Sequence, residues 1–322
     1  MSSVGLVLGG GGVTGAAFQS ATLLAIRLAT GWDPAEADVI VGTSGGAVTA
    51  AMVRGGGIST KFLNFRDRDE FTEELRSHLY RRARPDGLVR WARHGLLRGL
   101  RRPGVNFVLG SPARYHAGGI GEWVEERFGP FADWPPQPTV VAAYDLESGH
   151  RVAFGTEAAP DAPFPEAVAA ASAVPLLYRP YPIDGRHYVD GGVVSGTNAD
   201  LVLGSPRPLD LIVVIAPIGV SHQRRHHHFY EPFFDHAGRI ALVDETETIA
   251  EHWPDCEILT LTPTGTALDR MRPNPLSPEA AIPTFAITLR SMKRELAEPH
   301  VWEVLERHLL QPAISSGTGD SG

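Results

Sequence analysis

The sequence predicts a three-layer α/β/α fold, with a central, mostly parallel sheet between helices and a helical, arginine-rich insertion. Short apolar runs alternate with helical patterns in the order β-α-β-α over the first fifty residues, and the alternation resumes after residue 138. The 322 residues are 43% hydrophobic and 20% charged, which is typical of a globular enzyme. Strands joined by helical crossovers lie parallel in one sheet, so we expect a doubly wound arrangement.

The first βαβα unit can be followed element by element. A buried strand precedes a loop of four glycines, a helix that Gly31 ends, a second strand and a second helix. The expected bounds of these elements are Val4–Leu8, Gly9–Gly12, Thr14–Thr30, Val39–Val41 and Gly45–Val53.

Residues 55–135 differ from the rest of the chain because they are charged, rich in arginine and broken by prolines. We interpret them as an insertion or cap. Nine arginines and one acid lie between Arg76 and Arg102, a local charge of +8 in a chain whose net charge is −8. An acidic body with one basic segment argues against nucleic acid as a partner, and it indicates that the segment meets an anionic surface.

Within this basic segment, Arg76–Arg102, apolar residues recur every four positions at Leu88, Ala92, Leu96 and Leu100. A cationic amphipathic helix of this kind is typical of an element that binds an anionic membrane peripherally. A cap helix packed by its leucines, with its arginines solvated or ion-paired, fits equally well. The two interpretations are compatible.

Further elements after the insertion are expected to complete a single domain over residues 1–314. Strands are expected at 139–146, 151–154, 186–189, 209–216 and 257–262, and helices at 165–173, 236–252 and 283–310. The Ser/Gly-rich residues 315–322 are expected to form a disordered tail.

Other observations exclude several classes of protein. Cys256 is the only cysteine, which excludes an intramolecular disulfide and predicts a reducing, cytoplasmic location. The first residues lack the basic region of a signal peptide, and the longest apolar run, at 211–220, is too short to span a bilayer. No Cys/His spacing indicates zinc, and we expect neither a metal nor another cofactor.

The prediction of function begins with Gly42-Thr43-Ser44-Gly45-Gly46, directly after the second strand. The pattern is typical of a nucleophile elbow, in which a serine stands at a sharp turn between a strand and a helix. Gly42 and Gly46 are needed because a side chain at either position would collide with neighbouring elements. Ser44 would then present its hydroxyl at a helix N-terminus, where backbone dipoles stabilise negative charge.

A second motif, at residues 10–15, matches G-x-G-x-x-G. One interpretation is the pyrophosphate loop of a dinucleotide-binding oxidoreductase. Such a fold needs an acid just after the second strand, whereas Asp38 precedes that strand. The other interpretation is an oxyanion hole, in which the amides of Gly10, Gly11 and Gly12 bind the oxygen of a carbonyl attacked by the elbow serine.

The third motif, Asp190-Gly191-Gly192, follows a short strand and on its own would be read as an Asx turn. A serine nucleophile needs a base, yet none of the 13 histidines lies at a recognisable triad position. An α/β-hydrolase would also have more strands before its elbow. A Ser-Asp dyad, with Asp190 as the base for Ser44, therefore fits better than a Ser-His-Asp triad.

In this order, the three motifs resemble those of the patatin-like phospholipase family. A fourth block, Ala171-Ser172-Ala173-Val174-Pro175, resembles the small-residue segment that precedes the family's aspartate turn. The turn and the following Thr197-Asn198-Ala199-Asp200 are similar to the bacterial branch of the family. The resemblance covers about residues 4–216, and the ordered set of motifs is specific although each motif alone is weak.

The resemblance implies a lipid acyl hydrolase, such as a phospholipase A, lysophospholipase or esterase, that cleaves carboxylic esters through an acyl-serine. It implies Ser44 as nucleophile and Asp190 as base, with the oxyanion-hole and turn glycines Gly10, Gly11, Gly12, Gly42, Gly46, Gly191 and Gly192. The chain departs from the family at Thr14, where an arginine or lysine is usual. The alternatives are the dinucleotide-binding oxidoreductase and a catalytically silent lipid-binding protein on the same fold.

Overall fold

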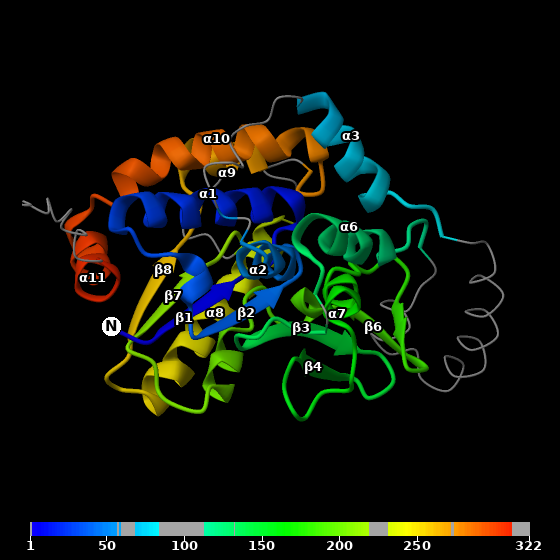
Figure 1. The fold of residues 1–322 in the computed structure, drawn as a ribbon, viewed down its shortest axis with the longest axis horizontal. Helices are drawn as coiled ribbons and strands as arrows, with labels where there is room; N and C mark the ends of the chain where they lie inside the picture. The colour runs from blue at the N-terminus through cyan, green and yellow to red at the C-terminus, as the bar shows by residue number, and fades with distance from the viewer. Residues whose placement is uncertain are drawn as a thin grey trace, which may run out of the picture.

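The structure is a computed structural model that describes residues 2–56, 58, 68–83, 113–131, 133–218, 231–271 and 274–310. One mixed sheet crosses the molecule, and helices cover both of its faces (Figure 1). This arrangement confirms the predicted α/β/α class.

Eight strands form the sheet within the described residues: β1 (Val4–Leu8), β2 (Val39–Thr43), β3 (Thr139–Asp145), β4 (His150–Phe154), β5 (Tyr181–Ile183), β6 (Arg186–Asp190), β7 (Leu211–Ile215) and β8 (Glu257–Leu261). Their order is β5-β6-β3-β2-β1-β7-β8, with β4 paired to β3. The central run β3-β2-β1-β7-β8 is parallel, whereas β4 and β6 are antiparallel to β3, and β5 to β6. The sheet is therefore mostly parallel, as predicted.

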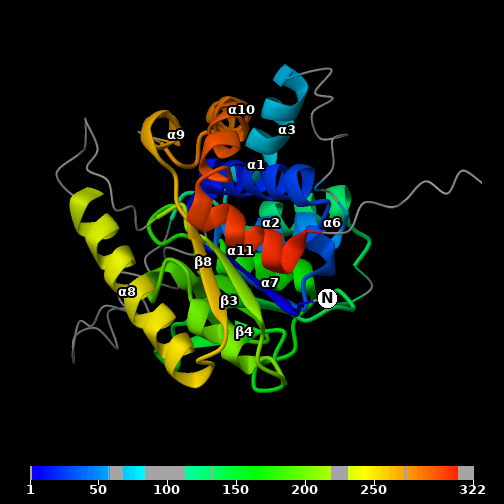
Figure 2. The same ribbon diagram turned by 90° about the vertical axis from the view of Figure 1, so that its left-hand side faces the viewer.

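The helices of the described residues are α1 (Gly12–Thr30), α2 (Gly45–Arg54), α3 (Arg68–Leu79), α6 (Gly118–Phe128), α7 (Phe164–Ala171), α8 (Glu231–His252), α9 (Gly265–Met271), α10 (Pro278–Glu295) and α11 (Pro299–Leu309). Short 3-10 turns lie at η1 (Pro34–Glu36), η3 (Gly191–Val193) and η4 (Ala199–Gly204). Figure 2 shows α8 on one side of the sheet and α1, α10 and α11 on the other.

The alternation of side chains along β1 divides the core between these two layers. Leu6 and Leu8 belong to a cluster with residues of α1, α10 and α11, whereas Val7 packs with residues of α8 and η4. Every residue of β1 and β7 is buried. Both faces of a parallel sheet are covered, so its central strands are apolar at every position instead of alternating.

The expectation that residues 283–310 are largely helical is confirmed, and the region comprises two helices, α10, which begins at Pro278, and α11. Proline suits the first turn of a helix, where its missing N–H has no partner to lose. Pro278 takes that place, and Pro283 lies inside α10. The other expected helices differ by a few residues at their ends: α1 begins at Gly12 and α7 at Phe164.

Two helices of the predicted insertion at 55–135 are described. Helix α6 packs against α7 and α2, and α3 packs against α6 and α10 at one end of the molecule (Figure 1). Most of the basic segment, at residues 84–102, and the predicted tail at 315–322 lie outside the described residues. The bounds of the insertion and of the single domain stay predictions. No helix among the described residues is long and apolar enough to cross a membrane.

Candidate active site

The glycine loop and the elbow serine meet because β1 and β2 are neighbours. The two strands pair in parallel, with Leu8 opposite Gly42, so both turns leave the same edge of the sheet. A Cβ built on Gly10 would lie 3.4 Å from the Cβ of Ser44. The loop and the elbow therefore lie together at one edge of the sheet, as an oxyanion hole beside Ser44 requires.

Asp190 reaches the same place through the register of β3. Ala142 of β3 pairs with Thr43 at the end of β2, and the next residue, Ala143, pairs with Asp190 at the end of β6. The ends of two strands that are far apart in sequence therefore lie side by side on one neighbour. This register places the Asp190 carboxylate at the Ser44 side chain, with which it interacts.

The elbow has the conformation that its sequence predicts. Ser44 has φ 54° and ψ −123°, a strained backbone for a residue with a side chain, and it forms the N-cap of α2. A Cβ on Gly46 would overlap the carbonyl oxygen of Leu8, and one on Gly42 would lie 2.7 Å from the Cα of Ala47. Both flanking glycines are thus required by the close approach of β1 and α2 to the turn.

Asp190 is buried, and its environment favours the protonated acid. Desolvation raises the pKa of its carboxyl group from 3.8 to about 6, although interactions with the Ser44 side chain and the Gly192 amide oppose the rise. The Gly192 N–H donates to Asp190 Oδ1 at 2.7 Å. A Cβ on Gly191 would overlap the carbonyl oxygen of Ala142, so this glycine lets the turn lie against β3.

The glycine loop offers fewer free amides than predicted. The Gly10 N–H donates to the carbonyl oxygen of Gly196 at 2.7 Å, so in this structure it is not available to an oxyanion. Among the described residues, the amides of Gly11 and Gly12 have no such backbone partner. They lie at the N-terminus of α1, with φ of 150° and 60°, conformations that favour glycine. An oxyanion hole built from this loop therefore rests on Gly11 and Gly12.

The small-residue block before the aspartate turn contacts both Ser44 and Asp190. Ser172 Oγ donates to the carbonyl oxygen of Ser44 at 3.4 Å, and the Ala173 carbonyl accepts the N–H of Asp190 at 3.1 Å. Both residues are buried. The block therefore helps to hold Ser44 and Asp190 in position relative to each other.

A loop after the aspartate turn ties the elbow to the glycine loop. Its Gly196 carbonyl binds Gly10, and its Thr197 carbonyl accepts the hydroxyl of Thr43, the residue before the nucleophile, at 3.1 Å. The side-chain amide of Asn198 donates to Thr43 Oγ1 at 3.0 Å, and the Asn198 backbone has a left-handed φ of 50°. The block that contains Thr197 and Asn198 was noted in the sequence, but its contacts were not predictable.

Glu245 of α8 anchors this loop from the opposite layer. Its Oε2 accepts the Thr197 hydroxyl at 2.6 Å and the Ala199 N–H at 2.8 Å, and its side chain is almost fully buried. Sequence reasoning missed Glu245, because nothing in a long, mixed helical pattern marks one glutamate as buried. A hydrogen-bonded carboxylate at a loop that touches both catalytic turns supports the geometry of the site.

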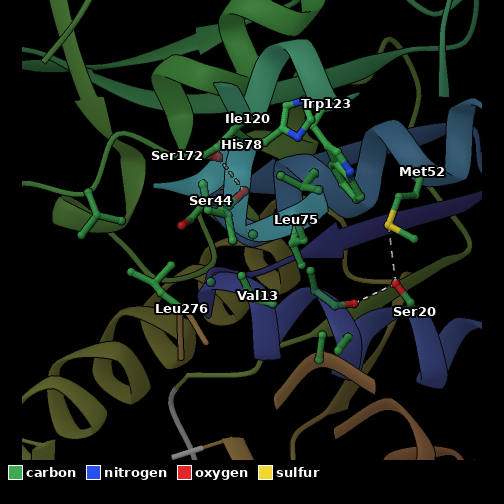
Figure 3. A pocket seen from close by; sticks show the side chains of 18 of the residues that line it. Val13, Ser20, Ser44, Met52, Leu75, His78, Ile120, Trp123, Ser172 and Leu276 are labelled. Atoms are coloured by element: carbon green, nitrogen blue, oxygen red, sulfur yellow. Dashed lines mark hydrogen bonds between the residues drawn. The ribbon is translucent and has the colours of Figure 1, made fainter. Parts of the chain in front are cut away.

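An apolar cavity extends from Ser44 between α1, α2, α3, α6 and α10 (Figure 3). His78 of α3 is the one histidine that lines this cavity among the described residues. Its Nδ1 lies 2.9 Å from the Glu74 carbonyl oxygen, and its Nε2 lies 3.4 Å from a carboxylate oxygen of Glu126. Both ring nitrogens of His78 thus have partners other than Ser44.

Thr14, where the family usually carries a cation, is buried against the segment before α10. Its N–H donates to the Pro275 carbonyl at 3.0 Å, and its hydroxyl donates to the Met271 carbonyl at 3.3 Å. A Cβ on Gly12 would lie 2.8 Å from the Pro275 oxygen. This segment therefore lies directly against the glycine loop and the first turn of α1.

Comparison with known proteins gives one family match and several similar solved structures. A family model described as patatin-like phospholipase matches residues 6–203. No curated protein matches the chain. Similar solved structures include VipD from Legionella pneumophila, with 15% identity, a TM-score of 0.35 and coverage of 90% of this chain and 67% of that one. Human GIVD cytosolic phospholipase A2 has 12% identity, a TM-score of 0.46 and coverage of 95% and 63%. The chain thus spans about two thirds of their length.

Proposed function

Because residues 6–203 match its family model, the chain belongs to the patatin-like phospholipase family, and we propose that it hydrolyses lipid carboxylic esters with a Ser44–Asp190 dyad. One observation carries the proposal. A serine on a strained elbow interacts with a buried aspartate whose pKa is raised to about 6, at one end of an apolar cavity. A base with a pKa closer to neutrality is better matched to proton transfer than an ordinary carboxylate.

In the acylation step, the Asp190 carboxylate takes the proton of the Ser44 hydroxyl while Oγ attacks the acyl carbon. The carbonyl electron pair moves to oxygen, where the amides of Gly11 and Gly12 and the N-terminus of α1 stabilise the negative charge. Donors of this kind typically contribute about 3–4 kcal/mol to the transition state. The intermediate then collapses, the C–O bond to the alcohol breaks, and the alcohol leaves with the proton held by Asp190.

In the deacylation step, Asp190 removes a proton from water, and the oxygen of that water attacks the acyl-serine. The same amides bind the second oxyanion. The bond between the acyl carbon and Ser44 Oγ breaks, the proton on Asp190 returns to Oγ, and the fatty acid is released. Atoms and charges balance with water as the only co-reactant.

The experiment compares the wild type with Ser44→Ala and Asp190→Asn on p-nitrophenyl esters and on defined phospholipids. We expect both variants to lose ester turnover and a fluorophosphonate to label the wild type at Ser44. Wild-type turnover in both variants would show that the dyad is wrong. Vesicle binding without turnover, unchanged by Ser44→Ala, would favour a silent lipid-binding protein, and tight NAD(P) binding would favour the oxidoreductase.

We also propose that the basic segment, Arg76–Arg102, contacts anionic membrane. Two of its described arginines have acidic partners, since Arg76 pairs with Glu73 and Glu279, and Arg81 pairs with Glu122. The proposal therefore rests on the arginines between residues 84 and 102. Neutralising Arg90, Arg93, Arg98 and Arg101 together should reduce binding to anionic vesicles, and equal binding by this variant would contradict the proposal.

A further inference from the structure

We infer that the cavity beside Ser44 binds the acyl chain of the substrate, closes at Ser20 and Met52, and selects medium-length chains of on the order of eight to ten carbons. The inference rests on the proposed function and adds a substrate class to it. Neither the glycine motifs nor the family match bears on chain length, which depends on where the cavity ends.

Helices α1 and α2 form the long side of the cavity. They begin together, because a Cβ on Gly45 would overlap the carbonyl oxygen of Gly12. They are still in contact two turns later, where Ser20 Oγ lies 3.8 Å from Met52 Sδ. Figure 3 shows Ser44 on one side of the cavity and this Ser20–Met52 contact on the other. The two helices therefore run side by side over the whole length of the cavity.

Apolar side chains line the space between these ends. Helix α1 contributes Val13, Ala16 and Ala17, and α2 contributes Val48, all at helical spacing on one stripe. Helix α3 covers the cavity with Phe71, Leu75 and Leu79, and α10 covers it with Ala281, Ile282 and Phe285. A surface of hydrocarbon along its length fits an alkyl chain, which needs no polar partner.

The end of the cavity opposite Ser44 is closed. Ser20 is 3% exposed and Met52 is 4% exposed, and Met52 belongs to the main hydrophobic core. The Ser20 hydroxyl donates to the carbonyl oxygen of Ala16 at 2.7 Å, so it needs no partner from a ligand. The closed end is therefore effectively apolar, and a chain that reaches it can go no further without displacing packed side chains.

The order of product release assigns the cavity to the acyl chain and not to the leaving alcohol. After the first chemical step the acyl group remains on Ser44, which lines the cavity, while the alcohol departs. An alcohol chain in the closed end would be trapped behind the acyl-serine. The acyl chain can stay in the cavity through both steps.

The distance from the nucleophile to the closed end sets the chain length. At about 1.5 Å per residue, α2 rises about 10 Å from Gly45 to Met52 and α1 rises about 12 Å from Gly12 to Ser20, which accommodates on the order of eight to ten carbons of an extended chain. Each methylene that is buried should raise kcat/KM about fourfold until the closed end is reached. Beyond that length, added methylenes stay in water or force the core apart, and kcat/KM should stop rising or fall.

The experiment measures kcat/KM on p-nitrophenyl esters from butanoate to palmitate at one detergent concentration. The wild type should peak at octanoate or decanoate. Met52→Ala, which removes the closed end, should move the optimum to longer chains by two or more carbons, on the order of the side chain removed. Val48→Phe, one turn nearer Ser44, should move the optimum to shorter chains.

Met292→Ala is the matched control for Met52→Ala. Met292 is also fully buried in the main core but does not line the cavity. Met292→Ala should lower the stability of the protein without changing the optimal acyl-chain length. Binding of free fatty acids of the same lengths to Ser44→Ala supplies a readout that needs no turnover and survives a loss of activity in any variant.

Two sets of results separate the inference from the proposed function. A wild-type optimum at palmitate, or the same optimum in Met52→Ala and Val48→Phe, would overturn the inference while ester hydrolysis stands. A dependence on the alcohol chain of alkyl acetates, with no dependence on acyl length, would also overturn it. Absence of turnover at every length would contradict the proposed function, and fatty-acid binding to Ser44→Ala would still decide the inference.

Discussion

Replacing Asp190 with asparagine should stabilise the folded protein while it removes ester turnover. The wild-type carboxylate is buried, and desolvation is the main cause of its raised pKa. A rise from 3.8 to about 6 corresponds to about 3 kcal/mol, at about 1.4 kcal/mol for each tenfold change in the ionisation constant. Asparagine carries no charge, and its Oδ1 can still accept the Gly192 N–H. Asp190→Asn should therefore raise the free energy of unfolding by up to about 3 kcal/mol.

The sign of the effect sets its pH dependence. The pKa of Asp190 is higher in the folded protein than in the unfolded chain, so the folded state holds the proton more tightly. Below about pH 4 the Asp190 side chain is neutral in both states, so its burial does not lower the free energy of unfolding of the wild type. The loss of stability caused by the buried charge grows between about pH 4 and pH 6 and is complete above about pH 6. The difference in the free energy of unfolding between Asp190→Asn and the wild type should show the same dependence on pH.

Urea unfolding of the two proteins at several pH values between 4 and 8 measures this difference. A useful control is Asp145→Asn. Asp145 is also buried, but hydrogen bonds from Arg186 and Ser148 outweigh its desolvation and lower its pKa. Loss of this charge should destabilise the protein at pH 8, the opposite sign. Equal or lower stability of Asp190→Asn at pH 8, or a difference that does not shrink toward pH 4, would refute the reasoning.

Three further predictions concern the geometry of the same site. Turnover should fall as the pH drops through about 6, because the base must be ionised to accept the serine proton; a pH–rate profile without an ionisation near 6 would argue against Asp190 as the base. Gly46→Ala should abolish turnover and lower stability by more than about 2 kcal/mol, whereas Gly204→Ala, where an added Cβ meets nothing within 4 Å, should change neither. Glu245→Ala should lower the free energy of unfolding by about 2–4 kcal/mol, because two hydrogen bonds to a charged group are lost, and it should reduce kcat. Glu245→Gln keeps an acceptor and should retain most of the stability and most of the kcat. Similar losses in the two variants would contradict the anchoring role of Glu245.

The parts of the site that were predictable from sequence are the local ones. The βαβα unit needs only hydrophobic periodicity and glycine stops, and its two strands were expected to be adjacent because the connection between them is short. The shared edge of the glycine loop and Ser44 follows from that unit. The elbow glycines were predictable for the same reason, since the steric demand of a strand-turn-helix lies within five residues.

The prediction of Asp190 needed more than its own motif: it depended on the lack of a placed histidine and on the resemblance of the ordered motifs to a family. Alone, an aspartate before two glycines is an ordinary turn. Its contact with Ser44 depends on the register of β3, where Ala142 and Ala143 receive the ends of β2 and β6. No local pattern contains that register, because it is a pairing between segments separated by many residues.

By itself, the sequence determined the class of the fold, the elbow at Ser44 and the glycine loop, because periodicity and steric need act over short stretches of chain. The tertiary structure decided what surrounds them. It joined the Gly10 amide to Gly196 and left Gly11 and Gly12 free of such a bond. It also buried Asp190 and Met52, which lines the cavity beside Ser44. Desolvation and cavity shape arise only when distant segments pack together, so they are properties of the assembled layers and not of any motif.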